Sequence, residues 1–483
     1  MRLATKLLPL MLVAMLAGAQ VRPAAAPEPS YKDLKYPPLK EVKIPEVARF
    51  TLPNGIKLYL LENHELPLVS GFALVRTGNL FDPPDKIGLA GITGTVMRTG
   101  GTAARTGDQL DGLLENMAAS VESGIGETSG RVSFSALREN TNDVLAMFKE
   151  VLTQPEFRQD KLDLIKSQMR SSIARRNDEP DAVASREFFE TLYGRDNSYG
   201  WRMEYEHLDR ITREDLQNFY RRYFFPSNIL LTVYGDFSTA EMRGRIEKLF
   251  ADWKVEQPAV PAFPPVREKA APGLYLASVP DVTQTFFQLG HLGGTFRDKD
   301  YPALEVMADI LGGSFRSRLV KRVRTQLGYA YDISASWAAN YNHPGVFVVS
   351  GSTKSATTTE ALEVIREEIQ KMRTAEVADD ELQVAKDTVL NSFVFNFDSP
   401  GKTLNRMVNY DYYGYPADFI FQYQKAVAAV TKADILRVAK QYIKPENFSI
   451  VAAGKPQDFG RPLTALGMEV KPIDLTIPAR KTP

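Results

Sequence analysis

Residues 215–228 read DLQNFYRRYFFPSN, and residues 434–447 read DILRVAKQYIKPEN in the same register, 219 positions further along the chain. Both copies begin with an aspartate and end with a proline two residues before an asparagine. An apolar segment follows each copy, at residues 229–234 and 448–453. A proline stop followed by an apolar run is typical of a helix that leads into a strand. Because helix, proline and strand recur in the same order, the sequence predicts an internal duplication.

The duplication predicts two homologous α+β domains. We expect an N-terminal domain at residues 48–254 and a C-terminal domain at residues 273–483. Between them, residues 255–272 contain five prolines. Segments so rich in proline form extended, semi-rigid linkers. The chain is therefore expected to be two similar units joined by a stiff connection.

Strand patterns support this division within the first unit. Residues 50–52 and 56–60 are apolar segments on either side of an Asn-Gly turn, which predicts a β-hairpin. Further strands are expected at residues 68–75 and 131–137. The sheet of the first unit should therefore begin with a hairpin.

Helical spacing appears between these strands. Thr106 and Gln109 form a capping-box pattern, and a stripe of apolar residues at helical spacing follows it. Further helices are expected around residues 144–151 and 162–173. The stripe after the capping box predicts one amphipathic helix whose buried face consists of Leu110, Leu113, Leu114, Met117 and Val121.

The composition is that of an ordinary soluble globular protein, with 44% hydrophobic and 24% charged residues among 483. Lys plus Arg and Asp plus Glu are equal at 59 each. This balance gives no support for nucleic acid or an anionic membrane surface as a partner. The chain has no cysteine, so disulfides and thiolate chemistry are excluded.

The N-terminus has the features of a secretory signal peptide. Arg2 and Lys6 precede an apolar run of 13 residues from Leu7 to Ala19 that ends in small residues. We expect cleavage after Ala19, or as late as Ala26, with an uncleaved membrane anchor as the alternative. Residues 20–47 would then be a flexible leader rich in Pro and Ala. These features predict a periplasmic or secreted protein without stable membrane insertion.

The segment GLAGITGTVMRTGGT at residues 88–102 carries a resemblance to a known family. It is similar to the catalytic helix of the M16 (insulinase and mitochondrial processing peptidase) family, whose pattern is G-L-A-H-x-x-E-H-M followed by G-T. The two zinc-ligating histidines of that pattern fall here on Gly91 and Thr95, and the general-base glutamate falls on Gly94. None of these three side chains can hold a zinc ion or accept a proton from water.

The family's third zinc ligand is also missing. It is a glutamate about 75 residues further on, before an Asp-x-Pro turn, and this chain resembles that turn at residues 178–180. The ligand position then falls on Ser171 or its neighbour Ser172. The resemblance therefore implies a subunit that binds no metal, with zinc expected in a partner. It also implies the fold: two LuxS/MPP-like domains, each a mostly antiparallel sheet packed with helices.

A second family pattern is retained in the C-terminal half. The segments LGGSFRSRL at 311–319 and VRTQLGYAY at 323–331 resemble L-G-G-x-x-x-S-R-L and L-R-E-x-x-G-L-A-Y. The resemblance assigns Arg324 and Tyr331 to a pair that assists the partner's zinc site. A guanidinium and a phenol can both donate hydrogen bonds to a substrate carbonyl and its oxyanion. The purely structural alternative is that Arg324 caps a helix and Tyr331 packs in a strand.

Other candidate residues carry weaker signals. Gly312 and Gly313 could form a substrate-binding loop, although a tight helix-to-strand connection explains them equally well. The chain has no phosphate-binding motif and no Gly-x-Ser-x-Gly motif. None of the four histidines lies three or four residues from another, so no local metal pair exists: His64, His207, His291 and His343. Four tyrosines could line a peptide-binding wall or pack at a helix end: Tyr410, Tyr412, Tyr413 and Tyr415.

These patterns together predict the non-zinc subunit of an exported, heterodimeric M16B-type metallopeptidase. Such a subunit would bind peptide or unfolded polypeptide through edge strands, present Arg324 and Tyr331 to the zinc-bearing partner, and hydrolyse nothing alone. Two alternatives remain open. One is a catalytically inactive structural scaffold, and the other is a peptide-binding homodimer.

Overall fold

The computed structural model describes residues 45–266 and 271–479. The expected signal peptide and nearly all of the expected leader lie outside the described residues. Among the described helices, none is both long and apolar enough to cross a membrane.

The first half of the chain builds a mixed six-stranded sheet with the order β1-β2-β6-β3-β5-β4. Only β2 and β6 are parallel, and all other neighbours are antiparallel. The expected hairpin and the strand at residues 68–75 are confirmed. The strands are β1 (Ala48–Thr51), β2 (Lys57–Glu62), β3 (Leu68–Val75), β4 (Ser120–Ile125), β5 (Gly130–Leu137) and β6 (Ile229–Gly235).

The second half repeats this arrangement in a sheet with the order β12-β7-β11-β8-β10-β9. Here β7 is parallel to both β11 and β12, and the other pairs are antiparallel. Five strands of the two sheets correspond in order and direction, with the edge strand β4 corresponding to β9. The opposite edges differ, because β1 is antiparallel to β2 whereas β12 is parallel to β7. The strands are β7 (Gly273–Ser278), β8 (Gln284–Leu292), β9 (Ala330–Ala338), β10 (Val346–Lys354), β11 (Ser449–Gly454) and β12 (Val470–Pro472).

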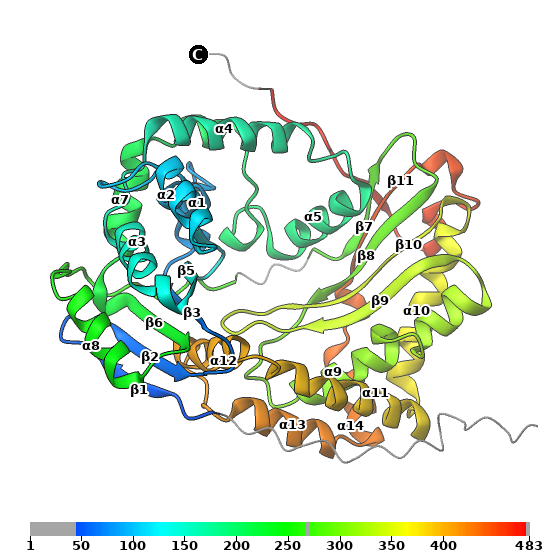
Figure 1. Ribbon diagram of the computed structural model, residues 1–483. Helices are drawn as coiled ribbons and strands as arrows, with labels where there is room; N and C mark the ends of the chain where they lie inside the picture. The colour runs from blue at the N-terminus through cyan, green and yellow to red at the C-terminus, as the bar shows by residue number, and fades with distance from the viewer. Residues whose placement is uncertain (1–44, 267–270, 480–483) are drawn as a thin grey trace, which may run out of the picture. The chain divides into compact units, whose positions relative to one another are not determined.

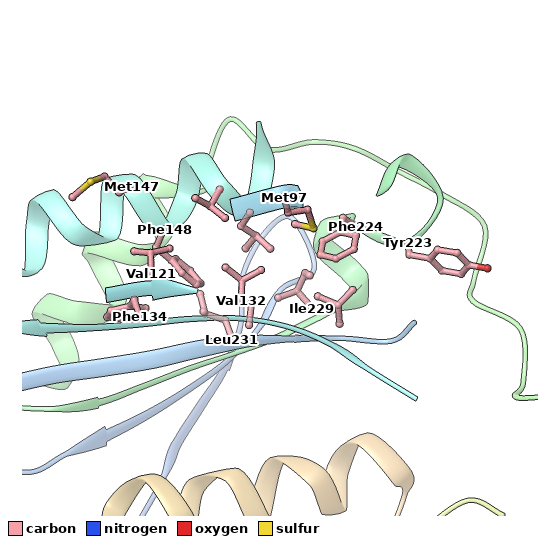
Figure 2. Packing of buried hydrophobic residues seen from close by; sticks show 14 of the residues in the cluster. Met97, Val121, Val132, Phe134, Met147, Phe148, Tyr223, Phe224, Ile229 and Leu231 are labelled. Carbon is pink, nitrogen blue, oxygen red and sulfur yellow. The ribbon is translucent and has the colours of Figure 1, made fainter. Parts of the chain in front are cut away.

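Helices cover one face of the first sheet and complete its core. Figure 2 shows part of this core, where Phe134 of β5 and Phe148 of α3 lie with ring centroids 5.0 Å apart beside Val121 of β4. The α-helices in this half of the chain, not all of which lie on its own sheet, are α1 (Leu89–Thr99), α2 (Gly107–Asn116), α3 (Thr141–Thr153), α4 (Gln159–Ala174), α5 (Pro180–Tyr193), α6 (Tyr205–Arg210), α7 (Arg213–Tyr223) and α8 (Thr239–Leu249).

The second half has a corresponding set of helices. Two π-helical segments, Asp309–Gly313 and Val320–Gln326, follow its first α-helix. The α-helices are α9 (Tyr301–Ala308), α10 (Thr358–Thr374), α11 (Asp379–Ser392), α12 (Pro400–Tyr413), α13 (Phe419–Ala429) and α14 (Lys432–Tyr442). Together with the two sheets, these helices confirm the expected α+β fold.

The duplicated sequence forms the same structure twice. In the first copy α7 ends before a short 3-10 turn at Pro226–Asn228 and leads into β6. In the second copy α14, the turn Pro445–Asn447 and β11 follow in the same order. Both helices begin with the same capping box, in which a threonine and an aspartate three residues later bond each other's backbone N–H.

One sequence-based expectation was wrong. The apolar stripe after Thr106 was expected to remain helical as far as Val121, but α2 ends at Asn116 and Val121 lies in β4. Ala118 has a φ of 48°, in the left-handed region that stops a helix. The side chain of Asn140 donates to the carbonyl of Met117 at 3.3 Å and stabilises this end. The sequence pattern therefore merged the end of a helix with a strand.

Each half supplies one helix to the other half's sheet. Helix α5 packs on β8 and β11 of the second sheet, and α12 packs on β6 of the first (Figure 1). Leu404 and Val408 of α12 are fully buried against Tyr59 and Phe72 of the first sheet. In the reverse direction, Val183 and Phe188 of α5 lie in clusters with residues of β7, β10 and β11. The main core of each half is separate, and smaller apolar clusters around α5 and α12 join the two halves.

Candidate functional site

The helix that resembles the M16 catalytic helix is α1, and its N-terminus is held by a buried carboxylate. Asp82 accepts hydrogen bonds from the backbone N–H groups of Gly88 and Ala90, both at 2.8 Å. Burial raises the pKa of Asp82 to about 7, although these two donors favour the charged form. Asp82 caps the free N–H groups of the first turn, which is a structural role.

The general-base position is closed by packing. A Cβ atom added at Gly94 would clash with the backbone N of Ile125 in β4, and Ser123 of β4 donates to the Gly94 carbonyl at 2.6 Å. Helix and edge strand thus touch backbone to backbone. A glutamate cannot occupy this position without displacing α1 from β4.

The zinc-ligand positions offer no donor for a metal. Gly91 faces open space, and the Thr95 hydroxyl donates to the Gly91 carbonyl at 3.1 Å. On α4, which packs against α1, Ser171 is exposed and donates to the Ser167 carbonyl at 3.2 Å. No cluster of three or more His, Asp or Glu residues that could hold a metal ion occurs in residues 45–266 and 271–479. The residues of α1 and α4 therefore do not fit a zinc ion.

Arg324 and Tyr331 form the second candidate site, and the fold brings them together. Arg324 lies on the π-helical segment and Tyr331 on β9, with a turn at Gly328, whose φ is 63°, between them. The guanidinium carbon of Arg324 lies 5.3 Å from the ring centroid of Tyr331 and 5.4 Å from that of Phe315. The cation thus lies beside two aromatic rings.

This cluster is open to solvent, unlike the α1 site. Phe315 is 80% exposed and Tyr331 is 79% exposed. Within the described ranges, no carboxylate lies within 4 Å of Arg324, so its charge is held by the two rings alone. We name Phe315, Arg324 and Tyr331 the Arg324 cluster. Tyr331 lies in a strand, as the structural alternative expects, but its side chain is at the surface.

A β-bulge directs Tyr331 outward. In the pairing of β9 with β10, Asp332 is opposite Ser352 and Ala330 is opposite Thr353, so Tyr331 is the extra residue. Bulges of this kind change the direction of one side chain at the edge of a sheet. The strand β9 is also the edge of its sheet, with β10 as its neighbour on one side. The Arg324 cluster therefore lies at an open sheet edge.

Gly312 and Gly313 lie in the other π-helical segment. A Cβ atom at Gly312 would clash with the backbone N of Ala335 in β9, and one at Gly313 would clash with the Asp309 side chain. Close packing thus accounts for both glycines, and their role in binding substrate stays a prediction. Three of the four tyrosines at residues 410–415 are likewise packed in the interior: Tyr410, Tyr412 and Tyr415.

Sequence reasoning missed Phe315. It lies within the LGG segment, at one of the positions that the family pattern leaves free, so the pattern gave no signal for it. The ring of Phe315 comes to lie beside Arg324 only through the fold of the chain after the first π-helical segment.

Two family models match this chain, and several known proteins are similar to it. Residues 60–200 match the family described as Insulinase (Peptidase family M16), and residues 210–389 match the family described as Peptidase M16 inactive domain. The non-peptidase homolog YmxG of Helicobacter pylori is 24% identical over 74% of this chain and 82% of its own length. The probable inactive metalloprotease YmfF of Bacillus subtilis is 24% identical over 52% of this chain and 54% of its own. Other relatives bear the name zinc protease.

The fold is also similar to that of a solved structure. The Peptidase M16 inactive domain of Pseudomonas fluorescens superimposes with a TM-score of 0.75, at 21% identity, over 85% of this chain and 98% of that chain. The two matched regions span both halves of the described fold. The chain therefore belongs to the M16 peptidase family, and its relatives include proteins named as non-peptidase or inactive homologues.

Proposed function

We propose that this chain is the non-zinc subunit of an exported, heterodimeric M16 metallopeptidase. It binds peptide at an open sheet edge and supplies Arg324 and Tyr331 to the active site of a zinc-bearing partner. The observation that carries this proposal is the contrast between the two candidate sites: helix α1 is closed by Gly94, whereas the Arg324 cluster is exposed and its cation has no carboxylate partner in the described structure.

The chemistry of the cluster fits a role in stabilising negative charge. An unpaired guanidinium and a phenol can donate to the oxyanion that forms when a zinc-bound water attacks a peptide carbonyl. Phe315 and Tyr331 hold the guanidinium without neutralising it. A cation paired with an internal carboxylate would stabilise an oxyanion far less.

The test is reconstitution with a zinc-bearing M16 protein from the same organism. The mixture should cleave an unfolded polypeptide, and Arg324→Ala should lower kcat/KM by about 100-fold, the usual cost of losing one oxyanion donor. Tyr331→Phe should have a smaller effect in the same direction. Arg322→Ala is the matched control, because Arg322 is an exposed residue of the same π-helical segment and bonds only Gln326, at 3.1 Å.

Two results would reject the proposal. One is an Arg324→Ala mixture as active as the wild-type mixture. The other is robust proteolysis by the isolated chain after treatment with a chelator. The scaffold and homodimer alternatives both predict that no partner confers activity, so the same reconstitution separates them from the heterodimer.

A further inference from the structure

A cavity of about 280 Å³ is lined by residues of α9, α11, α12 and α13. Seven of its thirteen lining residues are aromatic, and two are charged, Glu305 and Arg406. Pockets for drug-sized ligands usually have volumes of about 300–1,000 Å³, so this cavity fits a group the size of one amino acid residue. We call it the α12 pocket.

Arg406 of the α12 pocket has no carboxylate partner in the described part of the chain. One guanidinium nitrogen donates to the Asn396 side chain, and another donates weakly to the Tyr410 hydroxyl at 3.4 Å. The Nε atom is buried and has no hydrogen-bond partner there. A buried N–H without a partner keeps the cost of its lost hydration uncompensated. Two other arginines of the same half are paired, in contrast. Arg318 donates two hydrogen bonds to Glu381, and Arg437 donates two to Asp300.

The duplication shows what Arg406 has lost. Helices α5 and α12 both have 14 residues and begin with a proline, so Arg186 corresponds to Arg406. The three guanidinium nitrogens of Arg186 donate to the Glu187 carboxylate, the Arg176 carbonyl and the Asn177 side chain. The position of Glu187 is occupied in α12 by Met407. The second copy thus keeps the cation and lacks the anion.

A second polar group lies in the wall of the same pocket. Glu305 accepts a hydrogen bond from the Tyr423 hydroxyl at 2.6 Å, and no Lys, Arg or His of the described chain lies within 4 Å of it. Much of the remaining wall is aromatic and includes Tyr341 and Tyr410, whose ring centroids lie 6.4 Å apart. The pocket therefore offers a cation, aromatic faces and an anion.

We propose that the α12 pocket binds an aromatic residue with a free α-carboxylate. The carboxylate pairs with Arg406, where the first copy of the fold has Glu187, and the ring lies against the tyrosine walls. A free amino acid and the C-terminal residue of a peptide share this chemistry, and Glu305 adds a site for the ammonium group of the free amino acid. The proposal does not depend on a zinc-bearing partner, since the whole pocket belongs to this chain.

The test is calorimetric titration of the isolated chain with four probes: L-phenylalanine, L-phenylalanine amide, and the tripeptide Ala-Ala-Phe as its free acid and as its C-terminal amide. At least one acid should bind, and its amide should bind at least tenfold more weakly. Binding of the free amino acid alone identifies a metabolite site, and binding of the tripeptide acid identifies a C-terminus site. No binding by either acid up to millimolar concentration, or equal binding of acid and amide, overturns the proposal.

Variants of the same helix complete the test. Arg406→Met should weaken binding of the acid at least tenfold, and Arg406→Lys should restore part of it. Lys402→Met is the matched control, because Lys402 lies one turn earlier on α12, is exposed and pairs with Asp398. If Arg406→Met fails to fold, Ser392→Phe replaces it. Ser392 lines the pocket but is exposed, so this change fills the pocket at little cost to the core. Unchanged binding in Arg406→Met or in Ser392→Phe would reject the site, whereas Lys402→Met should bind as the wild type does.

Discussion

Helices α5 and α12 are the two copies of one element, and they differ on only one side. Both start at a proline, both end before a glycine, and both bury an apolar face on the other half's sheet. On α5 the polar side holds Glu187 and Glu190 in a buried network with Arg186, Arg195 and Arg202. On α12 the corresponding positions are Met407 and Tyr410. The buried face is fixed by the partner sheet, whereas the polar side was free to change.

The two helices that pack beside the edge strands show a similar contrast between the halves. In the first half Gly94 allows α1 to touch β4, and the face that would carry the metal is lost. In the second half Gly312 allows a π-helical segment to touch β9, and the next segment still presents Arg324 to solvent. Close contact between a helix and an edge strand is thus common to both halves. Only the second half keeps a candidate functional side chain there, Arg324.

The largest effect on the comparison of α5 with α12 should come from Glu187→Gln. This change leaves Arg186 and Arg202, which are largely buried, without their shared carboxylate. Removing one partner of a buried ion pair costs about 3–5 kcal/mol of the free energy of unfolding. The change at the corresponding polar side, Tyr410→Phe, removes only a long hydrogen bond and should cost less than about 1 kcal/mol. Urea denaturation measures the stability of both variants, and equal losses would contradict the contrast between the polar sides of α5 and α12.

Substitutions in the apolar face that both α5 and α12 bury should lower the free energy of unfolding somewhat less. Leu404→Ala on α12 removes a fully buried side chain from the first sheet and should cost about 2–4 kcal/mol. Val183→Ala on α5 is its counterpart on the second sheet, with a smaller cost because fewer atoms are removed. In both variants the two halves should still unfold in one transition, followed by circular dichroism and tryptophan fluorescence. Two separate transitions would show that the exchanged helices do not couple the halves.

The packing of α1 on β4 predicts opposite results at two glycines of one helix. Gly94→Ala should cost about 1–3 kcal/mol, because the added methyl group clashes with the backbone at Ile125. The methyl group added by Gly91→Ala would face open space. This variant should be more stable by up to about 1 kcal/mol, since alanine is a better helix former than glycine. Thermal denaturation of the two variants measures the difference. A tolerated Gly94→Ala would mean that the base position is not closed.

The smallest effect is a pH dependence where the two equivalent hairpins meet. His343 of the β9–β10 loop is buried beside Tyr199, with ring centroids 4.5 Å apart, and Glu127 of the β4–β5 turn lies 3.9 Å from it. Burial lowers the pKa of His343 from 6.5 to about 4. Neutral His343 therefore stabilises the folded state above pH 6.5, and this contribution is lost as the pH falls toward 4.

A pKa lowered from 6.5 to about 4 limits the loss between pH 7 and pH 5 to at most about 2 kcal/mol, and the Glu127 carboxylate makes the loss smaller because it favours protonated His343. His343→Gln should have a flatter profile of urea midpoint against pH over this range. Wild-type and variant profiles with the same slope would show that another group titrates there.

Local patterns predicted much of this structure, and long-range contacts account for what they missed. The capping box at Thr106, the Asn-Gly hairpin and the repeated helix, proline and strand are set by neighbouring residues, so the sequence alone identified them. The absence of zinc ligands was visible because the family motif is contiguous. The exchange of α5 and α12 and the α12 pocket depend on residues far apart in the chain. Phe315 is close to Arg324 in sequence, but the family pattern leaves its position free and no local periodicity places its ring beside Arg324. The strand at Val121 was missed because its apolar spacing continued that of α2.

The exchange of helices has a consequence for any attempt to divide the gene. A product that ended in the proline-rich linker would expose the surface that α12 now covers, including Phe72 and Leu74 of β3. It would also carry α5 with no sheet beneath it. Such fragments should aggregate when made separately and recover only when produced together, which sets a practical rule for expressing this protein in pieces.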